Sequence, residues 1–453
     1  MGTASNSSTP RAPLSHAGDG ARRYDVAILG GGASGLAAAI SAARAGARTA
    51  IIESDVEPGL GLLATGNGRC NISNSKLAAR KFLHEDAARE VLGRSPEADI
   101  RDFFEGIGLM LAEEDEGRLY PITRRAESVR DVLTGACARL GVDVLTGAEC
   151  VEAHRDAASG TWELVLSEPE SPLSFKRGRD AKAAIRNARR ALAIAPRRQR
   201  GLSAQRLVIA VGGASRSTCE ALGVPHLEER PVLCPIGCAP ALGAGPDPAD
   251  ALEGLDGLRV EAMLTLVRNG AAIAFEQGEV LFRPYGISGI AAFNLSRRVL
   301  HGDVIELDLF PHLSEASLLE LLARRTEAMG PFDGGKTWFD GMLARPLGAL
   351  IAHCISGQAE PLARAAALLH RLPFYVSGTA EHAQAHVRRG GIPLSAIDLS
   401  TCSLVASDDT PLAGLHACGE ALDMDADCGG YNLAWAWLTG IRAGTAAAKG
   451  AIC

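Results

Sequence analysis

Two groups of glycine, amide and acidic residues, near opposite ends of the 453-residue chain, have the composition of a dinucleotide site. The first is the G-x-G-x-x-G turn Gly30-Gly31-Gly32-Ala33-Ser34-Gly35, followed by Glu53 after a short apolar run. In such a turn the first glycine permits the tight bend, the second lets a pyrophosphate approach the backbone, and the third lets helix and strand pack closely. Free amides at the helix start attract the phosphate charge, and Glu53 accepts the ribose hydroxyls of an adenosine. The pattern predicts an ADP-containing cofactor; the alternative is a glycine-rich turn in an ordinary α/β domain.

The second group lies near the C-terminus and has the residue types that a flavin ring and its polyol chain require. Glu420 or Asp423, after a short strand, can accept hydrogen bonds from ribitol, while Gly429 and Gly430 let a flat ring lie against backbone. The helix that begins near Asn432 directs its positive end at that ring, which stabilises the negative charge a flavin gains on reduction. Nicotinamide proteins do not need this second element, so the two groups together predict FAD. A glycine-rich helix cap within the core is the alternative.

A loop at residues 58–74 (PGLGLLATGNGRCNISN) also has the chemistry for cofactor contact. Its glycines allow tight bends, and its amides and guanidinium donate hydrogen bonds to a phosphate or a planar ring. A self-satisfied Asn/Gly turn is the alternative, and Cys70 lies either near the redox centre or in the core as an inert thiol. The predicted cofactor contacts further include Ser54, Gly66, Asn67, Arg69, Cys70, Asn71, Cys150, Gly212, Gly213, Gly419, Tyr431 and Leu433.

The elements that must position these groups follow from hydrophobic spacing. Continuous apolar runs at 26–29, 49–52 and 207–211 predict buried parallel strands, and residues 33–43 have the spacing of a helix packed on them. Gly212 and Gly213 then follow the carboxyl end of a parallel strand, where ligands bind in such sheets. Further helices are predicted at 97–108, 129–140 and 434–449. The fold class predicted from this spacing is α/β, with a Rossmann-like domain assembled from two separate parts of the chain.

The middle of the chain has a different pattern. Short alternating strands between 231 and 310, followed by helical spacing from 314 to 370, predict a β-rich inserted domain and a small helical domain. We place the cofactor domain at 22–216 and 399–453, the β-rich domain at 217–311 and 372–398, and the helical domain at 312–371. Residues 1–21 are mostly Ser, Thr, Gly, Ala and Pro, and we expect them to form a disordered tail.

Bulk composition narrows the class of protein. A formal net charge of −7 argues against a general nucleic-acid-binding protein, and the 11 cysteines lack metal-ligand spacing, so we predict reduced thiols and no metal. No stretch is apolar and long enough to cross a bilayer, and we expect a cytoplasmic protein. Segment 176–206 has eleven Lys or Arg against Asp180 alone and predicts a basic amphipathic helix. We expect a solvated excursion there; contact with RNA or an anionic membrane is the alternative.

With these motifs in place, the chain resembles the BaiN/YhiN-type family of FAD-binding flavoproteins, which includes aminoacetone oxidases and bile-acid ene-reductases. The matching stretches are GGGASGLAAAI, LLATGNGRCNISN, GRLYPIT, VIAVGGAS, GISGIAAFNLSR and GLHACGEALDMDADCGGYNLAWAWLTG, and they span almost the whole length in family order. The resemblance implies an FAD domain interrupted by a β-barrel-like domain and a helical one. The chain departs from the family at Gly61, at Arg283-Pro284 and after Ser215, and we expect the last two positions to border the substrate cavity.

The resemblance also implies an FAD-dependent oxidoreductase. The expected reaction is reduction of a C=C bond conjugated to a carbonyl, as in the family's bile-acid branch, with hydride from flavin N5 and a proton from an acid. The expected substrate is a small molecule of the 3-oxo steroid type, and NAD(P)H, docked transiently, is a possible electron donor. Three alternatives stay open: oxidation of a small amine by oxygen, reduction of uridine in ribosomal RNA, which the basic segment would suit, and a non-enzymatic flavin-binding protein. The oligomeric state is not predicted. The candidate proton donors are Tyr120, Arg283, Tyr285, His416 and Tyr431.

Overall fold

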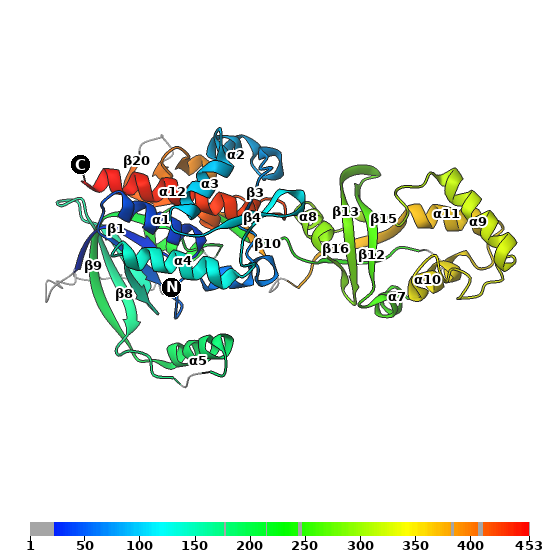
Figure 1. Ribbon diagram of the computed structural model, residues 1–453, viewed down its shortest axis with the longest axis horizontal. Helices are drawn as coiled ribbons and strands as arrows, with labels where there is room; N and C mark the ends of the chain where they lie inside the picture. Colours follow the sequence, from blue (N-terminus) through cyan, green and yellow to red (C-terminus); the bar gives the residue numbers. More distant parts are fainter. Residues whose placement is uncertain are drawn as a thin grey trace, which may run out of the picture.

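A mostly parallel sheet carries the first glycine turn and forms the centre of one half of the molecule (Figure 1). The computed structural model describes residues 22–175, 178–213, 215–242, 247–381, 385–405 and 411–452, so the tail predicted at 1–21 lies outside the described residues. The sheet and the helices packed on it are β1 (Arg22–Leu29), α1 (Ala33–Arg44), β2 (Thr49–Glu53), α4 (Ala126–Arg139), β6 (Asp143–Thr146), β9 (Arg197–Ile209), β18 (Ile397–Asp398), β19 (Ser403–Val405), β20 (Pro411–Ala417) and α12 (Tyr431–Ile452). The strand order is β18-β19-β20-β9-β1-β2-β6, with β20, β9, β1, β2 and β6 parallel. The α/β fold predicted from the sequence is confirmed.

Two helices from opposite ends of the chain, α1 and α12, pack side by side on this sheet (Figure 1). Gly440 and Gly444, about one turn apart on α12, face the backbone of α1. A Cβ on Gly440 would lie 2.5 Å from the carbonyl oxygen of Ser34, and a Cβ on Gly444 would lie 2.0 Å from that of Ala38. Since no side chain fits in that space, these two glycines set the distance between the helices.

An antiparallel ribbon extends from the sheet. It consists of β7 (Glu149–Arg155), β8 (Trp162–Pro169) and the long strand β9, and α5 (Ala181–Ile194) joins the far ends of β8 and β9 (Figure 1). The basic helix predicted from the sequence is present, and Asp180 caps it by accepting a 2.8 Å hydrogen bond from the Ala183 amide. The strand predicted at 207–211 begins earlier, at Arg197, and ends at Ile209. It begins earlier because its basic residues continue the ladder of hydrogen bonds with β8; one of them, Arg198, forms a 2.8 Å ion pair with Glu168.

A small three-stranded sheet and two helices lie against α12. They comprise α2 (Glu85–Leu92), α3 (Pro96–Glu105), β3 (Ser73–Asn74), β4 (Leu111–Glu113) and β5 (Arg118–Pro121), in the strand order β3-β5-β4. Trp437 of α12 is fully buried among them. Its indole donates a 3.0 Å hydrogen bond to the Ile72 carbonyl, and its ring meets Phe104 edge to face. The C-terminal helix is therefore anchored to a segment more than 300 residues earlier in the chain.

The β-rich insertion is a closed antiparallel barrel in the order β11-β14-β13-β12-β15-β16. The two strands predicted at 272–275 and 280–282 are one 13-residue strand, because its pairing with β12 continues across Gln277 and Gly278. Leu318, Leu322 and Ile351 of the helices belong to the same buried cluster as the barrel residues, so barrel and helices share one core. This unit comprises β11 (Ile236–Pro240), α7 (Pro248–Leu255), β12 (Arg259–Arg268), β13 (Ala271–Arg283), β14 (Gly286–Ser288), α8 (Ile290–Ser296), β15 (Val304–Asp308), α9 (Glu315–Met329), α10 (Arg345–Ile355), α11 (Pro361–His370) and β16 (Leu372–Thr379).

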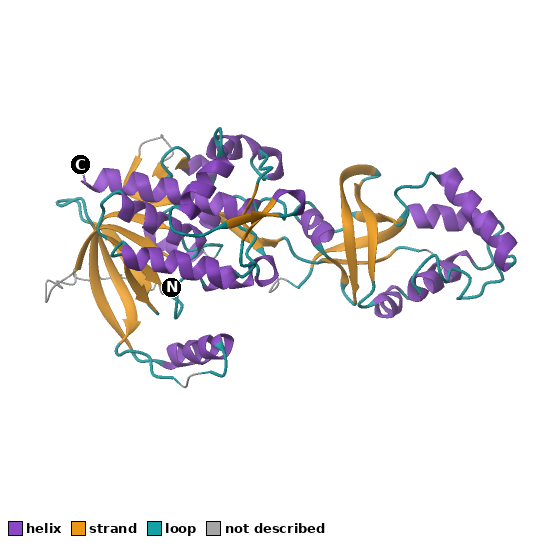
Figure 2. Ribbon diagram, in the orientation of Figure 1, coloured by secondary structure: helices purple, strands orange, loops and turns teal. Residues whose placement is uncertain are grey.

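The chain passes between the two halves twice, and the molecule is elongated as a result (Figures 1 and 2). After α6 (Arg216–Leu222), the outgoing strand β10 (Leu227–Val232) pairs antiparallel with the returning strand β17 (Val387–Gly391). One hydrophobic core uses residues up to Val224 and from Ile392 onward, and the other lies between Ile236 and Val376. None of the helices in the described ranges combines the length and apolarity needed to span a bilayer.

Candidate cofactor site

The first glycine turn has the shape of a phosphate cradle. Gly30 has a φ of +99°, and a Cβ on it would lie 2.4 Å from the Ala210 carbonyl oxygen; a Cβ on Gly35 would lie 1.9 Å from the Gly30 carbonyl oxygen. Gly32, by contrast, would place a Cβ with no atom within 4 Å. Two glycines thus serve close packing, while the third opens on free space at the start of α1. The open position and the N–H groups behind it fit the pyrophosphate of FAD.

Glu53 lies beside that cradle at the end of β2. Its Oε2 accepts a 2.7 Å hydrogen bond from the Gly31 amide, and its Oε1 accepts one of 2.7 Å from the Asp55 amide. Ser54 donates to the same carboxylate at 3.4 Å. A carboxylate has about four lone-pair sites, so one held in this way can still accept ribose hydroxyls. This carboxylate acceptor fits the ribose hydroxyls in the adenosine half of FAD.

Three neighbouring parallel strands end at the same edge of the sheet. Leu29 of β1 is in register with Ile209 of β9, which is in register with Ala417 of β20. The predicted contacts Gly212, Gly213 and Gly419 follow two of these strands. A Cβ on Gly213 would lie 2.6 Å from Glu420 Oε1, and one on Gly419 would lie 2.3 Å from Ser34 Oγ. The structure therefore brings the N-terminal turn containing Ala33 and Ser34 together with the predicted C-terminal contacts.

The ring end of the predicted site also consists of two distant segments that lie side by side. With the Asn71 side-chain amide oriented so that its nitrogen and its oxygen both have hydrogen-bond partners, the nitrogen donates to the Ser73 carbonyl at 2.9 Å and the oxygen accepts from the Gly430 N–H at 3.1 Å. Asn74 donates to the Gly429 carbonyl at 3.1 Å. Gly430 lies so close to this loop that a Cβ on it would be 2.4 Å from the Ser73 carbonyl oxygen. The loop at 66–74 and the double-glycine turn thus form one surface, with Leu433 in the first turn of α12 behind it.

Some predicted contacts have side chains that are engaged within the protein. Arg69 forms an ion pair with Glu114, and its guanidinium lies 4.2 Å from the ring centroid of Tyr120. The amide of Asn432 accepts from the Ala426 N–H and donates to the Ala426 carbonyl, both at 2.9 Å. These two side chains shape the loops around the site, whereas Gly66 and Asn67, with φ values of 55° each, bend the first loop.

The two predicted carboxylates hold strand β17. Asp423 accepts a 2.9 Å hydrogen bond from the Gly390 amide and lies 3.2 Å from His84 Nε2, and Glu420 accepts one of 2.7 Å from the Arg388 amide. Burial raises the pKa of Glu420 to about 6, which the Arg388 hydrogen bond opposes only in part. These two carboxylates therefore connect the edge of the parallel sheet to β17. With a pKa of about 6, Glu420 titrates close to neutral pH.

The candidate proton donors fall into two places. Tyr431 begins α12 and packs its ring 5.9 Å from that of Phe82, and Tyr120 lies under Arg69 beside the first loop. Arg283 and Tyr285 lie in the barrel instead, where Arg283 pairs with Asp256 at 3.1 Å and the Tyr285 carbonyl accepts from the Cys238 amide at 3.1 Å. Tyr120 and Tyr431 therefore lie beside loop 66–74 and the double-glycine turn, whereas Arg283 and Tyr285 lie in the barrel. Burial raises the pKa of Tyr431 above the ordinary value of a phenol.

Burial shifts the pKa values of three further predicted residues. Burial raises the pKa of Cys70 and of Cys150 to about 11 each, so both thiols stay protonated and unreactive at neutral pH. Burial lowers the pKa of His416 to about 4, and this residue lies within strand β20 with Nδ1 3.3 Å from the Thr401 carbonyl. An imidazole that is neutral at pH 7 cannot serve as a cationic proton donor, which argues against the role proposed for His416.

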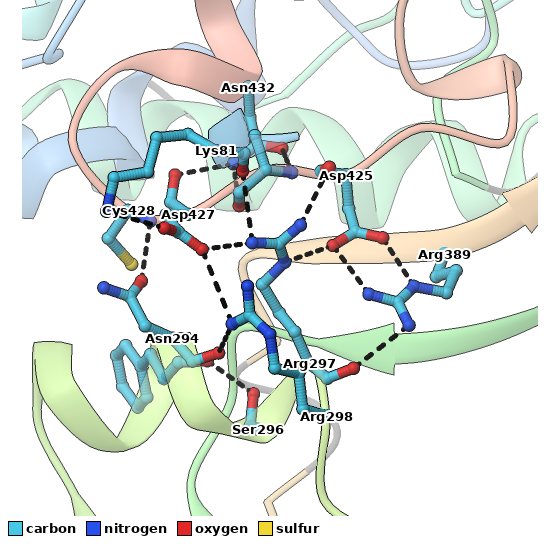
Figure 3. Close-up of polar contacts among 12 residues, drawn as sticks. Lys81, Asn294, Ser296, Arg297, Arg298, Arg389, Asp425, Asp427, Cys428 and Asn432 are labelled. Atoms are coloured by element: carbon cyan, nitrogen blue, oxygen red, sulfur yellow. Dashed lines mark hydrogen bonds and ion pairs between the residues drawn. The ribbon is translucent and has the colours of Figure 1, made fainter. Parts of the chain in front are cut away.

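A buried ionic cluster that sequence reasoning missed joins the barrel to the turn before Gly429 (Figure 3). Arg297, which follows α8, has a side chain only 2% exposed, and it pairs with Asp425 and Asp427. Arg389 of β17 pairs with the other oxygen of Asp425 at 2.6 Å. Burial acts to raise the pKa of Asp425, but the hydrogen bonds and charges of the two arginines outweigh it, and the pKa of Asp425 lies below its ordinary value. We call Lys81, Arg297, Arg298, Arg389, Asp425 and Asp427 the junction network.

The same turn is held by amides from both halves of the molecule. Asn294 of α8 accepts a 2.8 Å hydrogen bond from the Cys428 N–H, while Asn432 of α12 holds Ala426 from the other side (Figure 3). The sequence carried a signal for this arrangement: an arginine and an amide occur in the mostly small and apolar stretch GISGIAAFNLSR, and buried polar residues need partners. Nothing in the local spacing identified those partners.

Substitution of Gly32 separates folding from cofactor binding. Because a Cβ at Gly32 would meet no atom within 4 Å, we expect Gly32→Val to fold with a melting temperature close to that of the wild-type apoprotein. The same side chain would fill the space where a pyrophosphate approaches the backbone, so FAD affinity should fall by about tenfold or more, the value of a lost charge-assisted contact. Titration of the apoprotein with FAD, followed by flavin fluorescence, measures the affinity. Wild-type affinity in Gly32→Val would contradict the placement of the phosphates.

Comparison with known proteins was made for the sequence and for the fold. Residues 24–170 match the HI0933-like protein Rossmann domain, and residues 245–387 match the HI0933-like protein barrel and H2TH domain. The chain is 28% identical to the 3-dehydro-bile acid delta(4,6)-reductase of Clostridium scindens, over 94% of this chain and 99% of that protein. It is 23% identical to the ribosomal RNA dihydrouridine synthase of Escherichia coli, over 92% of this chain and 96% of that protein.

Among solved structures, the chain is similar to the 3-ketosteroid-delta4-(5alpha)-dehydrogenase from Rhodococcus jostii in complex with 4-androstene-3,17-dione. The identity is 13%, the TM-score is 0.47, and the match covers 96% of this chain and 98% of that one. It is also similar to the open conformation of a flavocytochrome c3 fumarate reductase, at 14% identity and a TM-score of 0.44, over 95% of this chain and 79% of that one.

Proposed function

We propose that this protein, which belongs to the HI0933-like family and is an FAD-dependent oxidoreductase, reduces a C=C bond conjugated to a carbonyl in a small, steroid-like molecule. One observation carries the proposal: the bile-acid reductase matches this chain from end to end, so the cofactor half and the barrel half are both shared. When bound, FAD supplies the hydride that such a reduction requires.

The chain's own residues bind and orient that cofactor. The amides at the start of α1 and the open position at Gly32 would hold the pyrophosphate, and Glu53 would hold the adenosine ribose. The surface formed by loop 66–74 and the double-glycine turn would hold the ring end. Because Asn71 and Asn74 fix that surface through hydrogen bonds to Gly430 and Gly429, the ring would meet a preorganised backbone.

The proton that completes the reduction would come from Tyr431. A phenol is protonated at neutral pH, and burial raises the pKa of Tyr431 further. Tyr431 also starts the helix that follows the double-glycine turn. Tyr120 is the second candidate, on the opposite loop. A Tyr431→Phe variant keeps the ring contact with Phe82 and removes only the hydroxyl. If Tyr431 donates the proton, this variant should keep substrate affinity and lose about 10²- to 10⁴-fold in kcat.

The proposed function is tested with the purified, FAD-loaded protein under argon. NADH or NADPH is expected to reduce the flavin, which bleaches its visible absorbance, and a 3-oxo-Δ4 steroid is expected to restore the absorbance while its double bond is lost. A small amine that bleaches the flavin, with oxygen restoring it, would contradict the proposal and favour an amine oxidase. Flavin that no enone reoxidises would also contradict it.

A second candidate function is the same reduction applied to a uridine ring in RNA, in which the double bond is likewise conjugated to a carbonyl. Two observations favour it: the similarity to a ribosomal RNA dihydrouridine synthase, and the exposed stripe of Lys182, Arg186 and Arg190 at four-residue spacing on α5. RNA binding that weakens steeply with salt and is lost when these three residues become glutamine would support it.

A further inference from the structure

The junction network borders a cavity of about 140 Å³ between the two halves of the molecule. Its walls are Phe82, Leu83, Arg297, Arg298 and Arg389. A water occupies roughly 30 Å³ in the liquid, so the cavity has room for a few waters or for one carboxylate or phosphate group. Three of its five lining residues are arginines and one is a phenylalanine.

The cationic side chains around this cavity are not equally well paired. Arg297 and Arg389 pair with the two oxygens of Asp425, and Arg297 and Lys81 pair with Asp427. The nearby Asp423 is held by His84 and by the Gly390 amide. An oxyanion in the cavity would therefore be met by the cation that these carboxylates leave without a close partner.

Arg298 is the cation with the weakest protein contacts in this cluster. Arg297 and Arg389 form close, multiple hydrogen bonds to Asp425 and Asp427. Arg298, in contrast, donates to the Asn294 carbonyl at 3.5 Å and lies 3.9 Å from Asp427, with 37% of its side chain exposed (Figure 3). Its guanidinium has five donors, which leaves enough for a bidentate contact with an oxyanion.

The cavity also lies next to the predicted ring end of the cofactor site. The Leu83 amide donates to the Asp425 carbonyl at 2.8 Å, and the Phe82 ring contacts Tyr431, which directly follows Gly430. Phe82 thus belongs to the cavity wall and also contacts the residue that directly follows the double-glycine turn. A small molecule reacting at that turn could place an anionic group against Arg298.

We propose that this cavity is an oxyanion subsite, in which Arg298, backed by Arg297 and Arg389, binds a carboxylate or phosphate group of a small molecule that reacts at the flavin. The inference rests on the proposed function and makes one of its two reaction partners, the substrate or the electron donor, an anionic molecule. The oxyanion has two sources, a carboxylate on the steroid-like substrate or a phosphate on the electron donor, and binding experiments distinguish them.

The first arm compares two ligands that differ only in charge: a 3-oxo-Δ4 steroid with a side-chain carboxylate, and its methyl ester. Binding to the oxidised holoenzyme is followed by the change in flavin absorbance, without turnover. We expect Arg298→Gln to weaken binding of the acid about tenfold and to leave the ester unchanged, because only the acid loses a charge-assisted contact. Arg298→Lys should recover part of the affinity, since it keeps the charge and loses the planar fork.

The matched control is Arg259→Gln, which removes an exposed barrel arginine paired with Glu279 and does not line the cavity. It should bind acid and ester as the wild type does. The second arm measures the affinity for NADPH in the same variants. A tenfold loss for NADPH in Arg298→Gln, with acid and ester unchanged, would identify the donor phosphate as the oxyanion.

A third measurement needs neither reaction partner. Inorganic phosphate at millimolar concentration is expected to raise the melting temperature of the wild-type holoenzyme and of Arg259→Gln, and to have no effect on Arg298→Gln. The subsite is disproved if Arg298→Gln changes none of these three quantities, or if it weakens acid and ester equally. Equal reduction of acid and ester, together with an unchanged NADPH affinity in Arg298→Gln, would leave the proposed function intact and overturn the subsite. Phosphate stabilisation that Arg298→Gln abolishes, without any enone reduction, would support the subsite and contradict the proposed function.

Discussion

Replacement of Arg297 with methionine is expected to destabilise the protein by about 3–5 kcal/mol, the usual cost of breaking a buried ion pair by removing one partner. Methionine is an unbranched side chain of similar length that can fill the space of the arginine stem, so the loss of stability comes from the missing charge and not from packing. Asp425 and Asp427, whose side chains are 0% and 4% exposed, would each lose a guanidinium partner. Arg389, Lys81 and the more distant Arg298 would remain to face them.

The same substitution should weaken FAD binding, because Arg297 holds the turn that precedes Gly429. Thermal unfolding followed by circular dichroism and by release of flavin fluorescence measures both effects. Arg345→Met is the matched control, since Arg345 also pairs with an aspartate but is 72% exposed, and its loss should cost no more than about 1 kcal/mol. Equal melting temperatures for Arg297→Met and Arg345→Met would refute the importance of the buried pairs.

Replacement of Gly444 with valine is expected to cost about 3 kcal/mol or more, the upper range for overpacking a core. A Cβ at this position would lie 2.0 Å from the Ala38 carbonyl oxygen and 2.7 Å from the Ala38 Cα, so the obstacle is backbone, which cannot rotate away. Helices α1 and α12 would have to separate, and the first glycine turn lies at the start of α1. Both stability and FAD content should therefore fall.

Gly444→Ala gives a milder test if the valine variant yields no soluble protein, and Gly254→Ala is the control. Gly254 also lies in a helix, α7, but a Cβ there meets no atom within 4 Å, so alanine should stabilise the protein by up to about 1 kcal/mol. Melting temperatures should thus move in opposite directions for the same chemical change. A Gly444→Ala variant as stable as the wild type would show that the helices can move apart freely.

The nucleotide half of the site could be predicted from the sequence because its determinants are local. Strand, glycine turn, helix and Glu53 occur within about thirty residues, and the backbone at Gly30 and Gly35 tolerates no side chain. The β-rich character of the insertion was recognised for a similar reason, since alternation within each strand reports burial directly. Its closure into a barrel was implied only by the family resemblance. The length of β13 was missed because the polar residues around Gln277 interrupt the apolar alternation, while the pairing with β12 continues through them.

The polar contacts of the ring end could not be predicted, because they are set by tertiary structure. Arg297 meets Asp425 across 128 residues, and Arg69 meets Glu114 across 45. From the sequence alone, Arg69 and Asn432 have free donors for a cofactor, whereas in the fold other protein groups engage them. Spacing reports which residues share an element, but it does not report which charge neutralises which. The assignment of individual residues to FAD, and of a tyrosine to proton transfer, stays a prediction that the variants above would test.

The pairing of α1 with α12 has a consequence for biosynthesis. On the ribosome, α1 emerges more than 380 residues before the helix whose glycines fit against it, so its apolar flank stays uncovered during most of translation. The barrel, with its own core between Ile236 and Val376, can become compact in that interval. Newly made N-terminal segments would then be the part most exposed to chaperones and proteases, and truncation shortly before Tyr431 would release a folded barrel on an unfolded nucleotide half.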